Sequence, residues 1–277
     1  MTDIISIDTG SDDLLAHIDG HVGVITFNRP DRRNALSDAI YAGFAAALPI
    51  MRDDPNVRVV MVTGNGGAFC AGGDVKGMHE NNSSGARASV SLEDGVANLR
   101  MRQKQVSLTL HEFPKPVIAA LPGAAAGAGM SIALSADLRI AAERAIIVTA
   151  FANVGASGDF GGSWFLTQLL GPAKAKELYF TSPRLSATEA KELGIVNEVL
   201  PDDGFAEAAL DYCRSLAERA PIAQRYMKEN INRALRVGLA EALDAEAAAM
   251  VRTMSTADHR EAAAAFVEKR SPNFQGS

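Results

Sequence analysis

The sequence predicts an α/β core over residues 1–200 and an all-helical region over residues 201–277. In the core, near-continuous apolar runs alternate with helical patterns, which indicates a parallel or mixed sheet covered on both faces. From Gly161 onward the apolar residues recur mainly at helical spacing, and we place the boundary near Pro201. The chain has 277 residues, of which 47% are apolar, so it is long enough to bury a large core.

The first third of the chain is predicted to form two strands, a helix and a third strand. Residues 14–18 and 22–27 flank a turn, and residues 57–63 form a β-branched run bounded by turn-forming residues. Between the second and third strands, Ser37 is placed to cap a helix that runs to about Met51. This order favours strands whose two faces are both covered.

The middle and end of the chain continue this pattern. We expect a helix over residues 94–112, a strand over 117–121, a helix in the following Gly/Ala segment, and short strands over 138–141 and 146–148. Ser186 and Glu189 form a capping box, and Gly194 supplies the left-handed stop of that short helix. An amphipathic helix begins near Phe205, and two or three further helices follow to Val267.

Charge and composition exclude several classes of protein. The 27 basic and 33 acidic residues give a net charge of −6, so we expect no nucleic-acid partner. Residues 116–136 carry no charge and are long enough to cross a bilayer, but their Pro, Gly and Ala content favours a buried strand, turn and helix. The acidic amino terminus is unlike a signal peptide, and two cysteines make no disulfide framework. We therefore expect a cytoplasmic protein that does not bind a membrane.

Motifs for nucleotides, metals and nucleophilic catalysis are incomplete. The glycines at 67 and 72 lack the lysine and hydroxyl residue of a phosphate loop, and residues 127–132 lack the third glycine of a dinucleotide loop. The sequence has no C-x-x-C or H-E-x-x-H pattern. We expect neither a metal nor a separate cofactor.

Two glycine-rich turns remain, over residues 68–75 and 123–131, and each follows a strong strand. Small residues let backbone N–H groups approach a ligand closely, and a helix that begins there adds partial positive charge. Two such turns side by side can hold one oxygen atom. The alternative is that the glycines only permit tight turns and close helix packing.

At these turns the sequence resembles a known family. The phrases ITFNRPDRRNALS, VVMVTGNGGAFCAGGDVK and KPVIAALPGAAAGAGMSIALSADLRIA are similar to the three signature blocks of the crotonase superfamily, also called the enoyl-CoA hydratase/isomerase family. GASGDFGGSW and the tail AFVEKRSPNF fit as well. The blocks occur in the family's order over nearly the whole chain.

The resemblance implies a fold, an assembly and a substrate. The fold would be a spiral of β-β-α turns with a carboxyl-terminal helical region used for trimerisation, as a homotrimer or a dimer of trimers. The substrate would be an acyl-CoA thioester whose carbonyl oxygen accepts hydrogen bonds from two backbone N–H groups, which match Gly73 and Ala128. Fixed donors of this kind stabilise the negative charge of an enolate.

Coenzyme A is an anion, which an acidic protein must meet with a local cluster of basic residues. The candidates are Arg29, Arg32 and Arg33 in the first block and Lys76 after the first glycine-rich turn. By likeness to family tails that reach the nucleotide of a neighbouring subunit, the tail adds Phe266, Lys269 and Arg270. For any one of these residues, a solvated charged face is the alternative.

The sequence departs from the family's hydratases at the two catalytic glutamates. The matching positions hold Ser131 and Phe151, neither of which is a base or acid near neutral pH. Asp159 instead matches the single catalytic aspartate of some isomerases in the family. The alternative for Asp159 is an N-cap of the helix that begins at Gly161.

Three functions follow from these residues. The first is double-bond isomerisation of an enoyl-CoA with Asp159 as the proton shuttle, since one carboxylate can take and return a proton. The second is enoyl-CoA hydration that uses Asp159 and a water held with help from Ser131 or from a side chain that the sequence does not identify. The third is a non-catalytic protein that binds coenzyme A thioesters or has a structural role. We expect the acyl pocket to be lined by residues 78–99, which do not reveal the acyl group.

Overall fold

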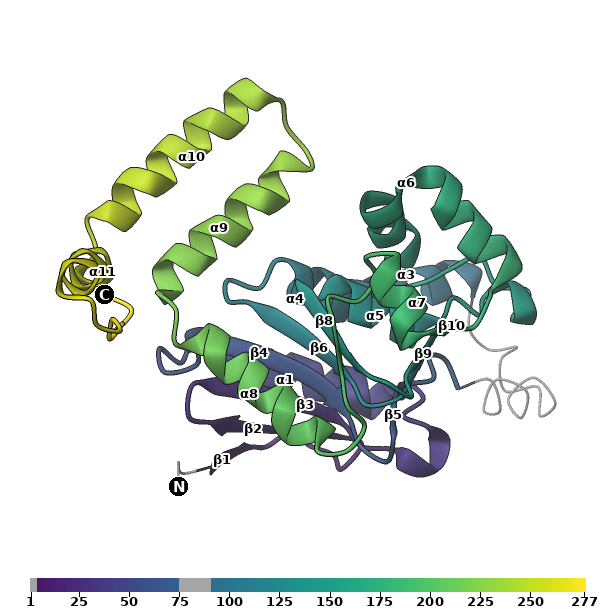
Figure 1. Cartoon of the computed structure of the whole chain (residues 1–277). Helices are drawn as coiled ribbons and strands as arrows, with labels where there is room; N and C mark the ends of the chain where they lie inside the picture. The colour runs from purple at the N-terminus through teal and green to yellow at the C-terminus, as the bar shows by residue number, and fades with distance from the viewer. Residues whose placement is uncertain (1–3, 75–90) are drawn as a thin grey trace.

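The computed structural model describes residues 4–74 and 91–277, in which two β-sheets are covered by helices (Figure 1). The larger sheet has an antiparallel edge of three strands followed by parallel strands. In spatial order it contains β1 (Ile4–Ile7), β2 (Leu14–Asp19), β3 (Val22–Phe27), β4 (Val59–Gly64), β6 (Val117–Leu121), β8 (Leu138–Ala142) and β11 (Glu198–Leu200). The smaller sheet contains β10 (Leu185–Ser186), β9 (Ile146–Val148), β7 (Ala124–Ala126) and β5 (Ala68–Cys70).

The strands and helices follow one another as repeated β-β-α units. In each unit the first strand joins the larger sheet, the second joins the smaller sheet, and a helix follows. The units are β4-β5-α3, β6-β7-α5 and β8-β9-α6, with α3 (Leu92–Gln103), α5 (Ala128–Ser135) and α6 (Gly162–Thr181). This arrangement confirms the predicted α/β core built as a spiral of β-β-α turns.

Helices cover both faces of the central strands of the larger sheet, which explains the near-continuous apolar runs of β4 and β6. On β4, Val60 and Val62 face the main core with α1 (Asp38–Asp53). Val59 and Met61 face the other way and pack with α8 (Phe205–Ala217). Because side chains alternate along a strand, a strand buried on both faces needs apolar residues at every position.

Several predicted details are present and two differ. Ser37 accepts a hydrogen bond from Ile40 N at 3.3 Å and caps α1, and the capping box of α7 (Ala187–Glu192) is complete. The two glycine-rich turns, however, each contain a short strand, β5 and β7, too brief to show a period of two. The predicted helix over 94–112 begins at Leu92 and contains a π-helical turn, η3 (Lys104–Leu108), before α4 (Thr109–His111). The short turns η1 (Pro30–Arg32) and η4 (Ala152–Val154) complete the core.

Three helices follow α8, and they extend beyond the sheets on one side (Figure 1). They are α9 (Pro221–Ala234), α10 (Leu239–Met254) and α11 (Ala257–Glu268). On α9, Lys228 Nζ donates to Asp137 Oδ2 at 2.8 Å and to the carbonyl of Leu110 at 3.3 Å, which ties the helix to the core. Burial lowers the pKa of Lys228 and raises the pKa of Asp137, and their mutual attraction opposes both shifts.

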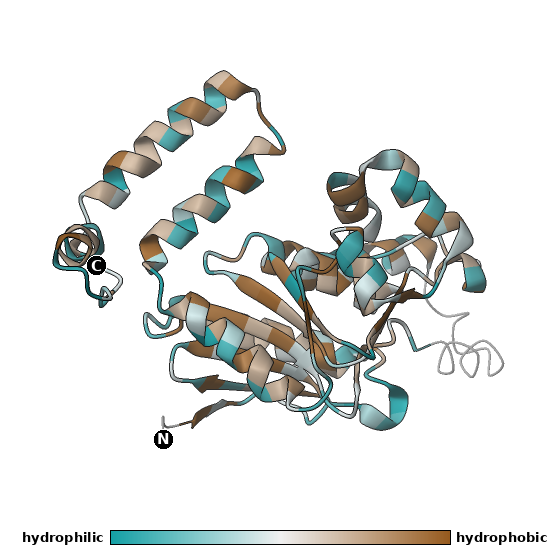
Figure 2. Cartoon of the chain, viewed as in Figure 1, coloured by the Kyte–Doolittle hydropathy of each residue, from teal (hydrophilic) through white to brown (hydrophobic). Residues whose placement is uncertain are grey.

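Apolar residues recur along the helices of this extension, as the hydropathy colouring shows (Figure 2). Many of their side chains are exposed. The largest exposed fractions belong to Phe266, Val267, Leu239, Val251 and Ile231. Among the described residues, no helix is both long and apolar enough to cross a membrane.

Candidate active site

The two glycine-rich turns meet at one edge of the smaller sheet. Strands β5 and β7 pair in parallel, with Ala68 opposite Ala124 and Cys70 opposite Ala125. Parallel neighbours end at the same edge, so the residues that follow each strand lie close together. A Cβ atom placed on Gly72 would be 2.7 Å from Ala126 O and 3.0 Å from Ala128 N. The structure therefore brings the turns of Gly73 and Ala128 together.

Glycine is required at these turns for two physical reasons. Gly72 has a φ of +84° and Gly127 a φ of +54°, a region that L-residues with side chains rarely adopt. At Gly129 there is no room, because a Cβ atom there would overlap Cys70 O. The small residues thus let two stretches of main chain approach one another.

The orientation of the two amides is set by their neighbours. Ala128 is the first residue of α5, and the first N–H groups of a helix have no intrahelical acceptor. Gly73 forms an isolated parallel bridge with Leu36, whose N–H donates to Gly72 O at 2.8 Å. In such a bridge the backbone groups of Gly73 itself point away from the Leu36 segment. Donors in this situation are suited to an oxygen that carries negative charge.

Asp159 lies in an unusual loop at the start of α6. Its Oδ1 accepts two hydrogen bonds of 2.7 Å, from Gln103 Nε2 and from Phe160 N. Phe160 is buried at 1% exposure with a φ of +49°, between Gly158 and Gly161, which also have positive φ. A bulky residue in this region is strained, and such strain clusters at functional sites.

The N-cap interpretation of Asp159 is wrong. The N-cap of α6 is Gly161, and no side chain caps that helix end. The Asp159 carboxylate bonds the N–H of the next residue instead, while its carbonyl accepts from Gly162 N at 3.1 Å. The left-handed conformations of the loop turn the carboxylate away from the first turn of the helix.

The positions that match the hydratase glutamates are occupied by packed groups. Ser131 is 1% exposed, and its Oγ donates to Gly127 O at 3.2 Å. The Phe151 ring stacks on Tyr179, with ring centroids 5.9 Å apart. Burial raises the pKa of Tyr179 to about 12, so its hydroxyl stays protonated. The described side chains therefore place hydroxyls and rings, not a pair of carboxylates, around Gly162, whose Cβ position touches both Ser131 and Tyr179.

Sequence reasoning missed two polar residues that support the site. Gln103 holds Asp159, and the two are 56 residues apart, so no local pattern could pair them. Asn34 is fully buried and donates from Nδ2 to Asn65 O and Ala68 O at 2.9 and 2.8 Å, which fixes the start of β5. The sequence shows only that Asn34 stands next to the apolar Ala35 and Leu36 in the phrase RRNALS. A polar residue that is buried beside them needs hydrogen-bond partners.

The basic residues of the first block have different roles. Arg29 is partly buried, pairs with Asp13 and Asp74 at 3.3 and 3.7 Å, and donates to Ala35 O at 2.7 Å. Arg33 is exposed, and its carbonyl accepts from Ala71 N at 3.0 Å, beside the first glycine-rich turn. Arg32 is exposed as well, whereas Lys76 lies outside the described residues.

The basic tail lies apart from the first block. Phe266 is 86% exposed at the end of α11, and Lys269 ends that helix in a left-handed conformation. Figure 1 shows α11 beyond α9 and α10, on the side of the molecule away from β5. Arg270 is occupied by Glu261 and Glu268, at 2.5 and 2.7 Å. Within one chain, the tail and first-block arginines do not form one cluster.

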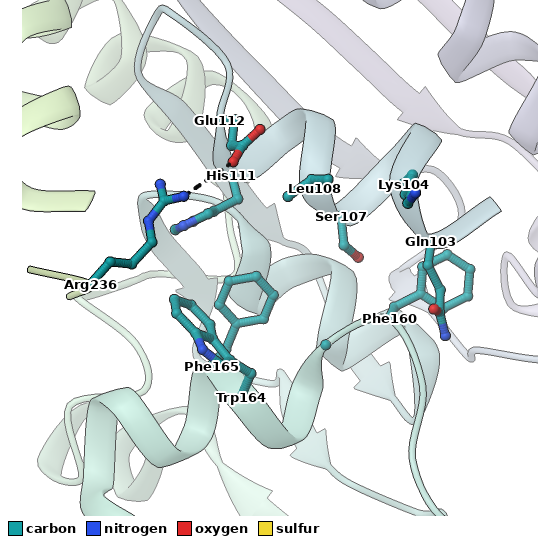
Figure 3. Close-up of a pocket in the computed structure, with 11 residues that line it drawn as sticks. Gln103, Lys104, Ser107, Leu108, His111, Glu112, Phe160, Trp164, Phe165 and Arg236 are labelled. Atoms are coloured by element: carbon teal, nitrogen blue, oxygen red, sulfur yellow. Dashed lines mark ion pairs between the residues drawn. The ribbon is translucent and has the colours of Figure 1, made fainter. Parts of the chain in front are cut away.

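A cavity of about 340 Å³ is lined by Gln103, which donates to Asp159, and by Phe160, the residue that follows Asp159 (Figure 3). One wall comes from the end of α3, η3 and α4, and the other from Phe160 and the first turns of α6. The acyl pocket was expected over residues 78–99, of which 78–90 lie outside the described residues. The cavity instead begins at Gln103, the last residue of α3. The described residues that line it are Gln103, Lys104, Ser107, Leu108, His111, Glu112, Phe160, Gly161, Trp164, Phe165 and Arg236.

We also considered a cysteine nucleophile and a metal site near the two turns. Burial raises the pKa of the Cys70 thiol to about 12, so it stays protonated and is a poor nucleophile. In the described ranges, no group of three or more His, Cys, Asp or Glu side chains could hold a metal ion. The candidates from the sequence analysis that the structure describes in this region are the main-chain amides of the two turns and Asp159.

Comparisons with known proteins show the family of the chain. Residues 17–277 match the family model described as Enoyl-CoA hydratase/isomerase. The chain is 35% identical over 263 residues to 1,2-epoxyphenylacetyl-CoA isomerase of Escherichia coli K12, covering 95% of this chain and 98% of the relative. It is 36% identical to human enoyl-CoA hydratase domain-containing protein 2, mitochondrial, covering 95% of this chain and 88% of the relative.

Solved structures show the same fold. An enoyl-CoA hydratase from Polaromonas sp. JS666 superposes with a TM-score of 0.87 at 36% identity, covering 94% of this chain and 99% of that one. An enoyl-CoA hydratase from Bacillus anthracis gives a TM-score of 0.84 at 34% identity, covering 96% and 100%. The likeness extends over the whole described architecture, including the carboxyl-terminal helices.

Proposed function

Because the chain belongs to the enoyl-CoA hydratase/isomerase family, we propose that it is an enzyme that moves a carbon–carbon double bond in an acyl-CoA thioester. The observation that carries this proposal is the combination of two adjoining turns that present backbone amides with a single carboxylate, Asp159. One of its relatives is named as an isomerase of an acyl-CoA, which supports the same reaction class.

In the proposed reaction, the thioester oxygen lies between the N–H groups of Gly73 and Ala128. Removal of a proton from C2 of a 3-enoyl thioester leaves a dienolate whose negative charge rests mainly on that oxygen. Fixed backbone donors stabilise this charge, and loss of one such donor typically raises a barrier by about 2.7–4 kcal/mol. Their effect depends on main-chain geometry alone, because no side chain provides them.

Asp159 carries the proton in this scheme. Its carboxylate takes the proton from C2 and returns it to C4, which leaves a 2-enoyl thioester and restores the carboxylate. Both observed hydrogen bonds, from Gln103 and Phe160, go to Oδ1. Within the described residues Oδ2 accepts no hydrogen bond, so this oxygen is the one we assign to proton transfer.

Isomerisation is favoured over hydration by what occupies the hydratase glutamate positions. Hydration needs a positioned water, its deprotonation and delivery of a proton to C2, which in the family uses two carboxylates. Here Ser131 and Phe151 stand at those positions, and the Phe151 ring packs against Tyr179. A phenyl ring at this position supplies no group that could deprotonate a water or deliver a proton to C2.

Hydration is the second candidate, since most of the similar proteins are named as hydratases. The hydroxyls of Ser131 and Tyr179, which both border Gly162, are the groups that would hold a water. A non-catalytic thioester-binding protein is the third, and it would bind coenzyme A thioesters without turnover.

Coenzyme A binding and assembly complete the proposal. We assign the nucleotide to Arg29, Arg33 and Lys76 of one subunit, joined by Phe266 and Lys269 of a neighbour in a homotrimer or a dimer of trimers. The exposed apolar side chains of α9–α11 support assembly, because monomers rarely expose large apolar patches. A cytoplasmic location, with no nucleic-acid, metal or further cofactor requirement, remains part of the proposal.

The test is a turnover assay with matched 3-enoyl and 2-enoyl thioesters. We expect the wild type to convert 3-hexenoyl-CoA to 2-hexenoyl-CoA and to hydrate 2-hexenoyl-CoA far more slowly. Asp159→Asn should reduce isomerisation about 10²–10⁴-fold, the usual contribution of a positioned acid–base group, while binding of hexanoyl-CoA persists.

Asp203→Asn is the matched control, because Asp203 is an exposed aspartate in the turn before α8, and it should leave turnover unchanged. Unchanged isomerisation in Asp159→Asn would remove Asp159 from the mechanism. Faster hydration than isomerisation by the wild type would favour the second candidate, and binding without any turnover the third.

A further inference from the structure

The cavity beside Asp159 has an aromatic end. His111 and Trp164 lie edge to face with ring centroids 5.4 Å apart, and Phe165 meets both, at 5.4 and 5.1 Å. Trp164 is 40% exposed, so the rings border open space and do not form a sealed core. Aromatic rings that meet edge to face present faces and edges to which another ring can add in the same geometry.

The same cavity contains a buried hydroxyl without a hydrogen-bond partner. Ser107 is 5% exposed, and its Oγ has no partner among the described residues. Figure 3 shows its side chain projecting from the helix toward the space between Phe165 and Phe160. A buried hydroxyl without a hydrogen-bond partner lowers the stability of the protein. We therefore expect a molecule in the cavity to supply a partner for Ser107 Oγ.

The helix is irregular at this hydroxyl. Ser107 lies in η3, the π-helical turn that interrupts the run from α3 to α4. Single π-helical turns inside α-helices are frequent at functional sites, because the extra residue shifts the direction of the side chains around it. The irregularity and the unpaired hydroxyl thus occur at one residue on the cavity wall.

We propose that this cavity binds the acyl part of the thioester and selects an acyl group that carries a flat ring with an oxygen substituent, which exchanges a hydrogen bond with Ser107. This inference rests on the proposed function, because it places the reacting carbons beside Asp159. The volume of about 340 Å³ lies at the lower end of small-molecule sites and accommodates a substituted ring.

The order of groups along the cavity fits this ligand. Gln103, Phe160 and Gly161 border the end next to Asp159, and the edge-to-face rings border the other end. Ser107 is one helical turn from each of Gln103 and His111 in sequence, so it lies between the two ends. A ring attached near the reacting carbons reaches the aromatic end, and its substituent passes Ser107.

The experiment measures binding of unreactive thioesters by titration calorimetry, so that no result depends on turnover. The probes are hexanoyl-CoA, phenylacetyl-CoA and the three isomers of hydroxyphenylacetyl-CoA. We expect phenylacetyl-CoA to bind about 3- to 10-fold more tightly than hexanoyl-CoA, as for an added aromatic contact. At least one hydroxylated isomer should bind a further 3- to 10-fold more tightly.

Two variants and a control assign the effect to residues. Ser107→Ala should remove the gain from the ring hydroxyl and leave hexanoyl-CoA binding within twofold. Trp164→Leu should remove the preference for the ring, and it alters a partly exposed residue, so folding is expected to persist. Ser163→Ala makes the same hydroxyl-to-methyl change at an exposed position and should change nothing.

The outcomes separate this inference from the proposed function. Equal binding of all probes, or an equal loss for all probes in Ser107→Ala, would overturn the inference while the thioester site stands. Failure of the wild type to bind any coenzyme A thioester would remove the proposed function itself.

Discussion

The strand-end turns and the helical wall contribute to the candidate site in different ways. At the turns of Gly72–Gly73 and Gly127–Ala128, all contributing groups are main-chain atoms, held by parallel pairing of β5 with β7. The helical wall, formed by α3, η3, α4 and the start of α6, contributes side chains such as Asp159, Gln103 and Ser107. The first region tolerates almost no added atom, whereas the second can exchange residues while the backbone stays.

This difference explains how one fold serves several reactions. Negative charge develops on the thioester oxygen whether a double bond moves or water is added. The same two backbone N–H groups, in the same positions, can therefore serve both reactions. Proton transfer depends on where a carboxylate stands, which one substitution changes. In this chain Ser131 and Phe151 replace the family's paired glutamates, while the turns keep their close approach.

The strongest way to break the first region is Gly72→Ala. The added Cβ would lie 2.7 Å from Ala126 O and 3.0 Å from Ala128 N, which forces the two turns apart. We expect kcat/KM to fall about 10²–10³-fold, as for the loss of one oxyanion donor. Steady-state kinetics on a 3-enoyl thioester measures the effect.

The matched control is Gly67→Ala. Gly67 also has a positive φ, +79°, but a Cβ atom there meets nothing within 4 Å. It should lower stability by about 1–2 kcal/mol through backbone strain and leave kcat/KM within about twofold. Similar losses of activity in both variants would mean that strain, and not the contact with the Ala128 turn, explains the result.

A smaller effect is expected on the helical wall from Gln103→Leu. The change removes the 2.7 Å hydrogen bond to Asp159 Oδ1 and keeps a residue that suits a helix. We expect kcat to fall about tenfold and KM to stay within about twofold, because the bond positions the carboxylate and does not bind coenzyme A.

Gln168→Leu serves as its control, since Gln168 is exposed on α6. A rise in KM with unchanged kcat in Gln103→Leu would show that Gln103 contributes to binding instead of positioning Asp159.

The smallest effect is a pH dependence of stability through His111. Burial lowers the pKa of His111 in the folded protein below the unfolded value of 6.5, and Lys228 and Arg236 also lower it while Asp137 and Glu112 oppose them. Above pH 6.5 both states are neutral at this group and it contributes nothing. Below pH 6.5 the unfolded chain binds the proton first, so stability falls until the folded-state pKa is reached.

Urea unfolding of the wild type and His111→Gln between pH 7.5 and 5 measures this contribution. One proton changes the free energy of unfolding by at most about 1.4 kcal/mol per pH unit. Because His111 is only partly buried, solvent screening makes the change smaller. The variant should be less sensitive to pH than the wild type. Burial lowers the pKa of His17 as well, so part of the slope should remain in the variant. Equal slopes in the two proteins would contradict the assignment.

Much of the fold could be predicted because its signals are local. The strand over residues 117–121, the capping box at Ser186 and the helix that begins at Phe205 all follow from short patterns. The short strands β5 and β7 could not be predicted, because runs of three residues, Ala-Phe-Cys in β5 and Ala-Ala-Ala in β7, show no period. Their pairing, and not their sequence, makes them strands.

The candidate site divides in the same way. Gly73, Ala128 and Asp159 could be proposed as site residues because glycine-rich turns and a family likeness mark them in the sequence. Gln103 and the unpaired hydroxyl of Ser107 were missed, because their roles depend on groups from α6 and its preceding loop. The cap interpretation of Asp159 failed because the positive φ of Phe160 cannot be read from a sequence in which an aromatic residue favours other conformations.

By itself, the sequence predicted the family, the longer strands and helices and the two glycine-rich turns, and it marked Asp159 as a candidate, since each depends on residue type or on spacing of a few positions. The tertiary structure alone decided which hydroxyl borders the cavity, which side-chain amide donates to Asp159 and which rings line the cavity. Those features join segments tens of residues apart, and only packing of the helical wall against the sheet fixes their distances.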